Sequence, residues 1–261
     1  MTTTRTKPLS DAERAVAWRH RSHSLVCDVI ESWEHGTAVR CTAHPGFWDY
    51  NSMRLEGPDT GASVDELAAA ADRCQNGLHH RRIEVEDEVA GGRLRPGFDL
   101  LGWRTTRLVW LALDDPPAGP EFEEVPVEAT RELRLEWARS EGYELGEREY
   151  QRQAEAEEDV ARRCGLRALV ERDAGGRLVA YVTFLTDGET AEVEQAYVEP
   201  ALRGRGTGGG LVAAAARAGG ASETFIVADD EGDPKRLYQR LGFRPVWIQH
   251  EFTRRPSATL D

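Results

Sequence analysis

The glycine-rich segment at residues 203–210 is the part of the sequence best suited to chemistry. It reads Arg-Gly-Arg-Gly-Thr-Gly-Gly-Gly, follows a predicted strand that ends near Pro200, and continues into an apolar predicted helix. Glycines leave backbone N–H groups free of side-chain cover, and the start of a helix carries the positive end of its dipole. The segment therefore predicts an anion site that suits a pyrophosphate, where Arg203 and Arg205 add charge-assisted hydrogen bonds.

Three other interpretations of this segment are weaker. Gly204, Gly206 and Gly209 match the letters of the dinucleotide fingerprint G-x-G-x-x-G, but its strand–helix–strand context is missing. A Walker loop requires G-K-[ST], which the segment lacks. A flexible surface linker accounts for the glycines but not for the orderly strand and apolar helix on either side.

A second motif follows the first after one more predicted strand. It is Leu237-Tyr238-Gln239-Arg240-Leu241-Gly242-Phe243, in which a tyrosine precedes Gly-Phe by four residues. In the first motif Arg203, Gly206 and Gly208 fill the pattern of Gln or Arg, two residues, Gly, one residue, Gly or Ala. With both motifs in this order, the chain resembles the GNAT superfamily of acyl-CoA-dependent N-acyltransferases. The clear resemblance covers residues 122–252.

The resemblance implies an α/β fold of two GNAT-like domains, each with a mixed central sheet flanked by helices. More loosely, the whole chain is similar to bacterial tandem proteins whose N-terminal half is degenerate. The run from Asp114 to Pro120 is rich in proline, which removes backbone donors and disfavours helix, so it reads as an extended linker. We therefore predict a degenerate N-terminal domain at 1–115, a linker at 116–120 and a catalytic domain at 121–261.

The resemblance also implies how an acyl-CoA binds and reacts. In the family the pantetheine arm bonds to the strand before the glycine loop, and the pyrophosphate binds the N–H groups of the loop. The implied cofactor-binding residues are Ala196, Tyr197, Val198, Arg203, Gly204, Arg205, Gly206, Thr207, Gly208 and Gly209. The implied co-substrate is acetyl-CoA, and the acceptor is an amine of a small molecule that attacks the thioester directly.

The implied catalytic residues are Tyr238, Glu194 and Glu192. Tyr238 is the candidate acid that protonates the leaving thiolate, and its alternative role is packing on a helix face. Glu194 is the first candidate for the base that deprotonates the amine. Strand alternation puts Glu192 and Glu194 on one face, opposite Val193 and Gln195, so spacing does not separate the two acids. Both could equally be solvated carboxylates on a strand face.

An acidic segment departs from the family pattern. Family members often carry an asparagine shortly before the tyrosine helix, where this chain has Asp-Asp-Glu-Gly-Asp at residues 229–233. These carboxylates would repel a polyanionic donor unless they point away or hold a cation. A non-CoA donor therefore stays open, either an aminoacyl-tRNA or a carrier-protein thioester, as does a non-catalytic module that binds acyl-CoA. A basic face formed by Arg73, Arg81, Arg82, Arg93 and Arg95 would favour the tRNA donor.

Composition and charge restrict the classes of partner that we expect this protein to bind. The 261 residues carry a formal net charge of -13, which argues against nucleic-acid binding and suits a cationic small substrate. The four cysteines form no C-x-x-C pair, and no carboxylate or thiol is spaced to complete a metal site with His20, His23, His79 or His80, so we expect no metal. The sequence shows no signal peptide and no membrane span. We expect a cytoplasmic monomer or homodimer.

The elements that must position these residues have the same order in both halves. In the N-terminal half, residues 11–34 read as helix with a candidate break near Ser22, and Ser63 caps an alanine-rich helix. Residues 82–89 alternate as a strand with apolar residues on one side and acids on the other, and residues 96–101 form a short helix. In the C-terminal half we predict a helix at 147–164, a hairpin at 166–185, a strand at 191–198 and a helix at 206–218. The matching order makes a duplication plausible.

Overall fold

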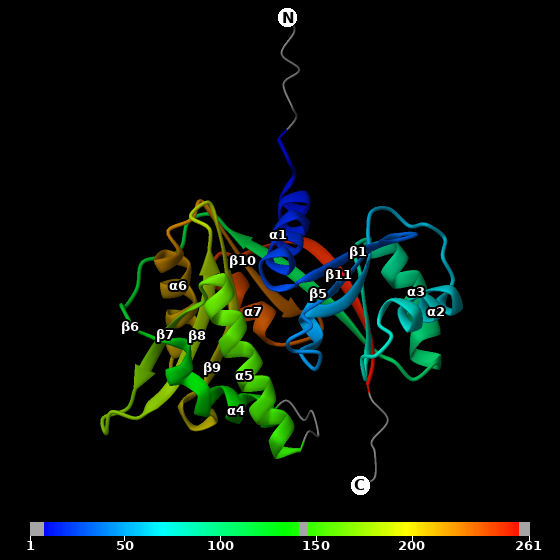
Figure 1. The fold of residues 1–261 in the computed structure, drawn as a ribbon. Helices are drawn as coiled ribbons and strands as arrows, with labels where there is room; N and C mark the ends of the chain where they lie inside the picture. Colours follow the sequence, from blue (N-terminus) through cyan, green and yellow to red (C-terminus); the bar gives the residue numbers. More distant parts are fainter. Residues whose placement is uncertain (1–7, 141–145, 256–261) are drawn as a thin grey trace, which may run out of the picture.

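The computed structural model describes residues 8–140 and 146–255, which form one mixed sheet of eleven strands with helices packed on it (Figure 1). The elements of the N-terminal half are α1 (Asp11–Val26), β1 (Val29–Trp33), β2 (Gly36–Arg40), the 3-10 helix η1 (Trp48–Tyr50), β3 (Asn51–Leu55), α2 (Val64–Cys74), β4 (Arg81–Val85), α3 (Glu88–Leu100) and β5 (Arg104–Leu113). Those of the C-terminal half are β6 (Glu123–Val125), η2 (Val127–Thr130), α4 (Arg131–Ser140), α5 (Glu147–Cys164), β7 (Arg167–Arg172), β8 (Leu178–Thr186), β9 (Thr190–Val198), η3 (Pro200–Leu202), α6 (Thr207–Gly219), β10 (Glu223–Asp229), α7 (Pro234–Arg240) and β11 (Arg244–Arg254).

The two halves of the chain exchange their last strands. The strand order is β1-β2-β3-β4-β11-β5-β10-β9-β8-β7-β6. The final strand β11 therefore lies between β4 and β5, whereas β5 lies between β11 and β10, and all three of these pairings are antiparallel. Each of these two strands has both of its neighbours in the other half. The division into domains at 116–120 stays a prediction, but the sheet itself is continuous across it.

One arrangement is repeated in the two halves. In each, a parallel strand pair is joined by a crossover helix, β3–α2–β4 in the first half and β9–α6–β10 in the second. In each, the helix after that pair ends in Leu-Gly-aromatic, at residues 101–103 and 241–243. The N–H of Trp103 donates to the carbonyl of Phe98, and that of Phe243 donates to the carbonyl of Tyr238. The first half thus carries Phe98 where the second half carries Tyr238.

Three predicted elements of the N-terminal half are wrong in extent. The short helix predicted at 96–101 is only the last part of α3, which runs from Glu88 to Leu100. The predicted helix at 11–34 ends at Val26, because residues 29–33 pair with β2 as an edge strand. The predicted strand at 82–89 ends at Val85, because the side chain of Asp87 accepts a hydrogen bond from the N–H of Ala90 and starts α3 there. The predicted capping box at Ser63 is confirmed, with Glu66 as its partner.

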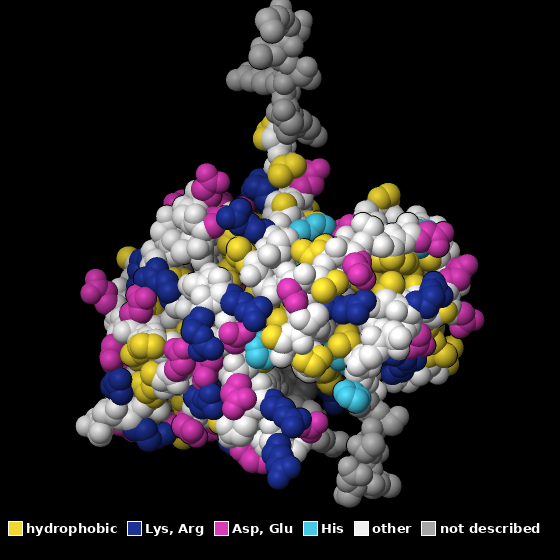
Figure 2. Space-filling view, viewed as in Figure 1, with side chains coloured by type: hydrophobic (Ala, Val, Ile, Leu, Met, Phe, Trp, Pro, Cys, Tyr) yellow, Lys and Arg dark blue, Asp and Glu magenta, His cyan; other side chains and the backbone are white. Residues whose placement is uncertain are grey.

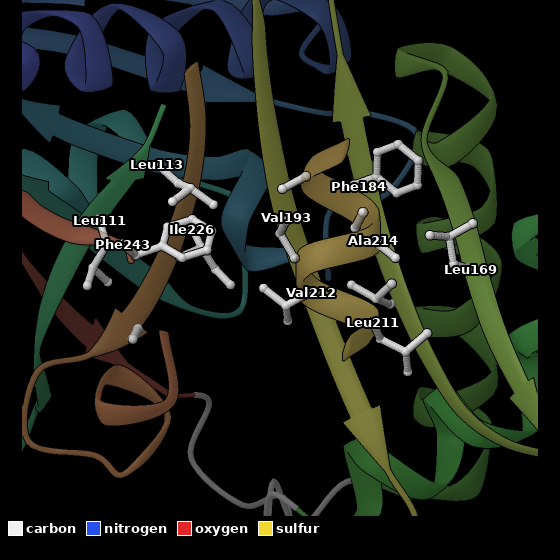
Figure 3. Close-up of a cluster of buried hydrophobic side chains, with 14 of the residues drawn as sticks. Leu111, Leu113, Leu169, Phe184, Val193, Leu211, Val212, Ala214, Ile226 and Phe243 are labelled. Carbon is white, nitrogen blue, oxygen red and sulfur yellow. The ribbon is translucent and has the colours of Figure 1, made fainter. Parts of the chain in front are cut away.

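The main core joins both halves. Apolar residues of α6 pack against β8, β9 and β10 and also against Leu111 and Leu113 of β5, which comes from the first half (Figure 3). A second cluster lies beneath α1, which packs against β11 and α5 over the middle of the sheet (Figure 1). Among the described helices none is long and apolar enough to cross a membrane.

Candidate active site

The glycine segment forms a tight loop that ends in the first turn of α6. Gly204 and Gly206 have φ angles of 79° and 90°, a left-handed conformation that side-chain-bearing residues rarely adopt. The first hydrogen bond within the helix runs from the N–H of Gly210 to the carbonyl of Gly206, at 2.9 Å. The N–H groups of Thr207, Gly208 and Gly209 therefore have no partner inside the helix, and this end of α6 is suited to an anion.

The remaining glycines of the segment allow close packing around this turn. A Cβ atom on Gly208 would lie 3.4 Å from Val198 Cγ2, at the end of β9. One on Gly209 would lie 3.4 Å from Leu237 Cδ1, on α7. Contacts of 3.4 Å lie at the tight end of ordinary van der Waals contact, so the turn packs closely against β9 and α7. The run of glycines thus fixes the loop against its supports.

The two arginines of the segment lie at the protein surface beside the loop. The Nε of Arg203 donates to the carbonyl of Val198 at 3.0 Å, and its guanidinium lies 5.6 Å from the centre of the Tyr197 ring. Arg205 and Thr207 line a cavity of about 280 Å³ together with Val198 and the turn of the β7–β8 hairpin. Both arginines therefore add positive charge beside the loop.

The parallel strands β9 and β10 separate before they end. Their register runs from Thr190 opposite Glu223 to Val193 opposite Ile226 and goes no further. Ala196, Tyr197 and Val198 still pair with β8, so the ladder is closed on one side of β9 and open on the side that faces β10. In the first half, by contrast, β3 and β4 stay paired to their last residues, Leu55 and Val85. Only the C-terminal pair opens toward a glycine loop.

A β-bulge sits at Glu194. In the β8–β9 ladder Phe184 is opposite Val193 and Thr183 is opposite Gln195, so Glu194 has no residue opposite it. Bulges re-aim side chains and are frequent beside active sites. The bulge moves Gln195 to the same face as Glu192, where its side-chain oxygen accepts from the Tyr181 hydroxyl at 2.5 Å. The predicted alternation, with Gln195 on the opposite face, is therefore wrong.

The structure separates the two candidate bases that sequence spacing left equivalent. Glu192 is 6% exposed, and its Oε2 accepts a hydrogen bond of 2.6 Å from the indole N–H of Trp18 on α1. Glu194 is exposed to solvent, although many protein atoms lie around its carboxyl group. Desolvation and then the charge of Glu192 raise the pKa of Glu194 well above its ordinary value. Desolvation also raises the pKa of Glu192, against the charge of Arg19 and the indole hydrogen bond.

Tyr238 is half-buried on α7 and packs against the main core. That core also contains Ala196 and Val198 of β9 and Ala228 of β10, which lie beyond the last paired residues of the two strands. Burial raises the pKa of the Tyr238 hydroxyl. Within the described residues this hydroxyl has no hydrogen-bond partner, so it is available to a ligand.

The acidic segment before α7 is held by cations, most of them from the first half. Glu231 pairs with Arg95 of α3 at 2.8 Å, and Asp230 pairs with Arg107 of β5 and with Lys235. The side chain of Asp229 accepts from the N–H of Glu231. The repulsion expected from the sequence is therefore reduced by ion pairs that only the folded chain makes.

Three residues that sequence spacing did not connect come together near the end of α1. A ring nitrogen of His20 lies 2.5 Å from Glu86 Oε1, and together with Glu56 the three offer possible metal-ligand atoms within 4.8 Å of one another. Glu56 also accepts from Arg54 at 2.9 Å, so these groups already have partners. They come from α1 and from the ends of β3 and β4, which explains why no motif indicated them.

Comparison with known proteins agrees with this geometry. Residues 165–245 match the family model described as the acetyltransferase (GNAT) domain. A GCN5-related N-acetyltransferase from Kribbella flavida superposes with a TM-score of 0.62 at 17% identity, covering 97% of this chain and 98% of the other. A functionally unknown conserved protein from Staphylococcus epidermidis gives a TM-score of 0.71 at 13% identity, covering 89% and 96%. A GNAT-family protein from Novosphingobium aromaticivorans gives 0.53 at 18%, covering 92% and 96%. No curated protein matches the sequence.

The chain has the α/β fold of the GNAT acetyltransferases, which its structural neighbours share along nearly their whole length. Within it, residues 165–245, which contain the glycine loop, the opened strand pair and Tyr238, match the acetyltransferase (GNAT) domain. The expected fold class and family resemblance are confirmed.

Proposed function

We propose that the protein is an N-acyltransferase that moves an acetyl group from acetyl-CoA to an amine of a small molecule. The observation that carries this proposal is the opening between β9 and β10, which begins at Glu194 and leads to the free N–H groups of α6. The loop N–H groups, with Arg203 and Arg205, bind the pyrophosphate. The open backbone edge of residues 196–198 binds the pantetheine arm, and acetyl-CoA supplies an activated thioester at the opening.

Glu194 and Tyr238 carry the proton transfers in this proposal. The amine nitrogen forms a bond to the thioester carbonyl carbon, and the bond from that carbon to sulfur breaks. Glu194 takes the proton of the amine, directly or through a water, and its raised pKa makes it a stronger base than an ordinary carboxylate. Tyr238 gives its hydroxyl proton to the leaving thiolate and regains one from solvent. The amine attacks directly, so no acyl group is attached to the protein.

Titration calorimetry with acetyl-CoA tests the binding part of the proposal. We expect Arg203→Glu to weaken binding at least tenfold, because it removes a charge-assisted contact and adds a repulsive charge beside the phosphates. Arg236→Glu is the matched control, since this arginine of α7 is exposed and pairs only loosely with Asp233, at 3.7 Å. Equal affinities for the wild type and both variants would contradict the assignment of the loop.

Thiol release from acetyl-CoA against a panel of amines tests turnover. We expect Glu194→Gln to lower kcat by about 100-fold, the effect of losing a general base, with acetyl-CoA affinity unchanged. Tyr238→Phe should lower kcat by about 10-fold or more with the same affinity. Saturable binding without turnover on any amine would instead favour a module that senses acyl-CoA.

The structure gives little support to an aminoacyl-tRNA donor. Of the five arginines that could form a basic face, four are engaged by carboxylates: Arg81 by Asp72, Arg82 by Asp49 and Glu251, Arg93 by Asp59, and Arg95 by Glu231. Basic and acidic side chains are interspersed on the face shown in Figure 2. A nucleic acid needs cations that are free to neutralise its phosphates. We therefore keep a free CoA thioester as the donor.

A further inference from the structure

The N-terminal half reaches Glu192, the neighbour of the proposed base Glu194, through a buried hydrogen bond. Trp18 of α1 is 5% exposed, and its indole N–H donates to Glu192 Oε2 at 2.6 Å. Glu192 lies two residues before Glu194 on β9, beneath a cluster of rings that includes Trp18, Phe225 and Trp247. Because Glu192 is buried under α1, it has no path to an acceptor, whereas Glu194 reaches solvent.

We propose that Trp18 is a positioning residue for the acyl transfer: its indole N–H holds the Glu192 carboxylate ionised and in place behind Glu194, and so maintains Glu194 as the base. The inference rests on the proposed function of Glu194. It assigns the degenerate first half a role in the reaction, because the indole N–H that binds Glu192 comes from α1.

The physical argument has two steps. A hydrogen bond to a carboxylate favours its charged form, so the indole opposes the desolvation of Glu192. The charge of Glu192 in turn raises the pKa of Glu194, after the desolvation of Glu194 itself. If the indole N–H is removed, Glu192 takes up a proton more readily, its charge is lost, and Glu194 becomes a weaker base that ionises at lower pH.

Other groups face the pair and must be held constant in a test. Arg19 of α1 acts on both carboxylates and is fixed by Glu84 of β4. Asp49 of η1 acts on Glu194. Burial raises the pKa of Tyr50 of η1 and of Cys164 at the end of α5, and the charges of Glu194 and Glu192 raise both pKa values further. None of these side chains contacts the indole N–H.

The test is Trp18→Phe, which keeps a large ring but removes the donor. We expect the acid limb of the kcat profile to move down by about one pH unit and the plateau to fall several-fold, with the KM for acetyl-CoA unchanged. Glu192→Gln, which removes the charge itself, should move the limb in the same direction. A role in packing alone would lower activity at every pH without moving the limb.

Trp247→Phe is the matched control. Trp247 belongs to the same ring cluster, but its indole N–H donates to the backbone carbonyl of Glu86 at 2.9 Å, away from the pair. This variant should leave the limb in place. A limb that stays fixed or moves upward in Trp18→Phe overturns the proposal, as does a fixed limb in Glu192→Gln.

A second measurement does not depend on turnover. Carboxyl carbon NMR of protein labelled on glutamate follows the ionisation of Glu194 directly, with Glu194→Gln to assign its resonance. We expect Glu194 to titrate at lower pH in Trp18→Phe and in Glu192→Gln than in the wild type. If this shift occurs in a protein that acetylates no amine, the proposed function fails, but the effect of Trp18 on the two carboxylates stands. If the protein is active and Glu194 titrates at the same pH in all variants, the positioning fails alone.

Discussion

Glu84 is the clearest place to test what a buried ion pair contributes to stability. It is 1% exposed in the middle of the sheet, although the strand pattern of residues 82–89 predicts its side chain on the solvent side. Its carboxylate accepts hydrogen bonds from Arg19 at 2.9 and 3.1 Å, from Ser52 at 2.8 Å and from Gln249 of β11 at 2.9 Å. Burial raises the pKa of Glu84, but the charges of Arg19, His23 and Arg82 and the hydrogen bond from Arg19 together outweigh it and hold the pKa well below the ordinary value.

Glu84→Gln should lower the free energy of unfolding by about 3–5 kcal/mol, because it leaves the Arg19 guanidinium buried without its counter-charge. The side chain of Arg19 is only 14% exposed, so water cannot replace the carboxylate. This is a large part of the roughly 5–15 kcal/mol by which domains are stable. Urea unfolding followed by tryptophan fluorescence measures the change.

Removing the cation of this ion pair instead of the anion should give a destabilisation that depends differently on pH. Arg19→Met leaves Glu84 buried and unpaired, but a carboxyl group can take up a proton, whereas a guanidinium cannot lose one. The destabilisation by Arg19→Met should therefore shrink as the pH falls, while that by Glu84→Gln should not. The double variant should cost at least about 2 kcal/mol less than the sum of the two single changes. Additive effects, or a Glu84→Gln cost under about 1 kcal/mol, would refute the reasoning.

Three further predictions concern stability. His80 is buried, and desolvation lowers its pKa to about 4, so the folded chain binds a proton at His80 less readily than the unfolded chain does. The free energy of unfolding should therefore fall by about 3 kcal/mol as the pH falls from about 6.5 toward 4. Urea unfolding of His80→Gln should show a smaller loss over the same pH range. His250 is 2% exposed with no hydrogen-bond partner for either ring nitrogen among the described residues, so His250→Leu should raise the unfolding free energy by about 1 kcal/mol, and an unchanged or lower urea midpoint would contradict this. Residues 121–261 made alone should fail to fold, because β11 and β10 would lack β5, the strand between them. Co-expression with residues 1–120 should restore a folded protein, as measured by circular dichroism. A fragment that folds by itself would argue against the shared sheet.

Much of the local structure follows from the sequence because its causes are local. The helix at 147–164 has the predicted limits, and Ser63 caps the alanine-rich helix as expected, since capping involves residues three apart. The glycine loop was predicted from letters alone, because positive φ angles and free N–H groups at a helix start need no distant partner. The two GNAT motifs likewise lie within short stretches.

The details of the proposed site were not predictable in the same way. The bulge at Glu194 depends on the register of β9 against β8, and alternation along a single strand does not contain that information. The edge strand at 29–33 read as helix because only its pairing with β2 makes it a strand. From the sequence, the acidic segment at 229–233 was expected to repel a polyanionic donor, because its partners Arg95 and Arg107 are far away in the sequence.

The sequence by itself determined the glycine loop, the tyrosine helix and the class of the fold, because each depends on residues that are close together in the chain. Only the tertiary structure decided that the halves exchange β5 and β11, that Glu84 is buried in an ion pair, and that Glu192 and Glu194 differ. Each of these depends on contacts between segments that lie far apart in the sequence. The free energy of such contacts comes from burial and hydrogen bonding that exist only once both segments are in place.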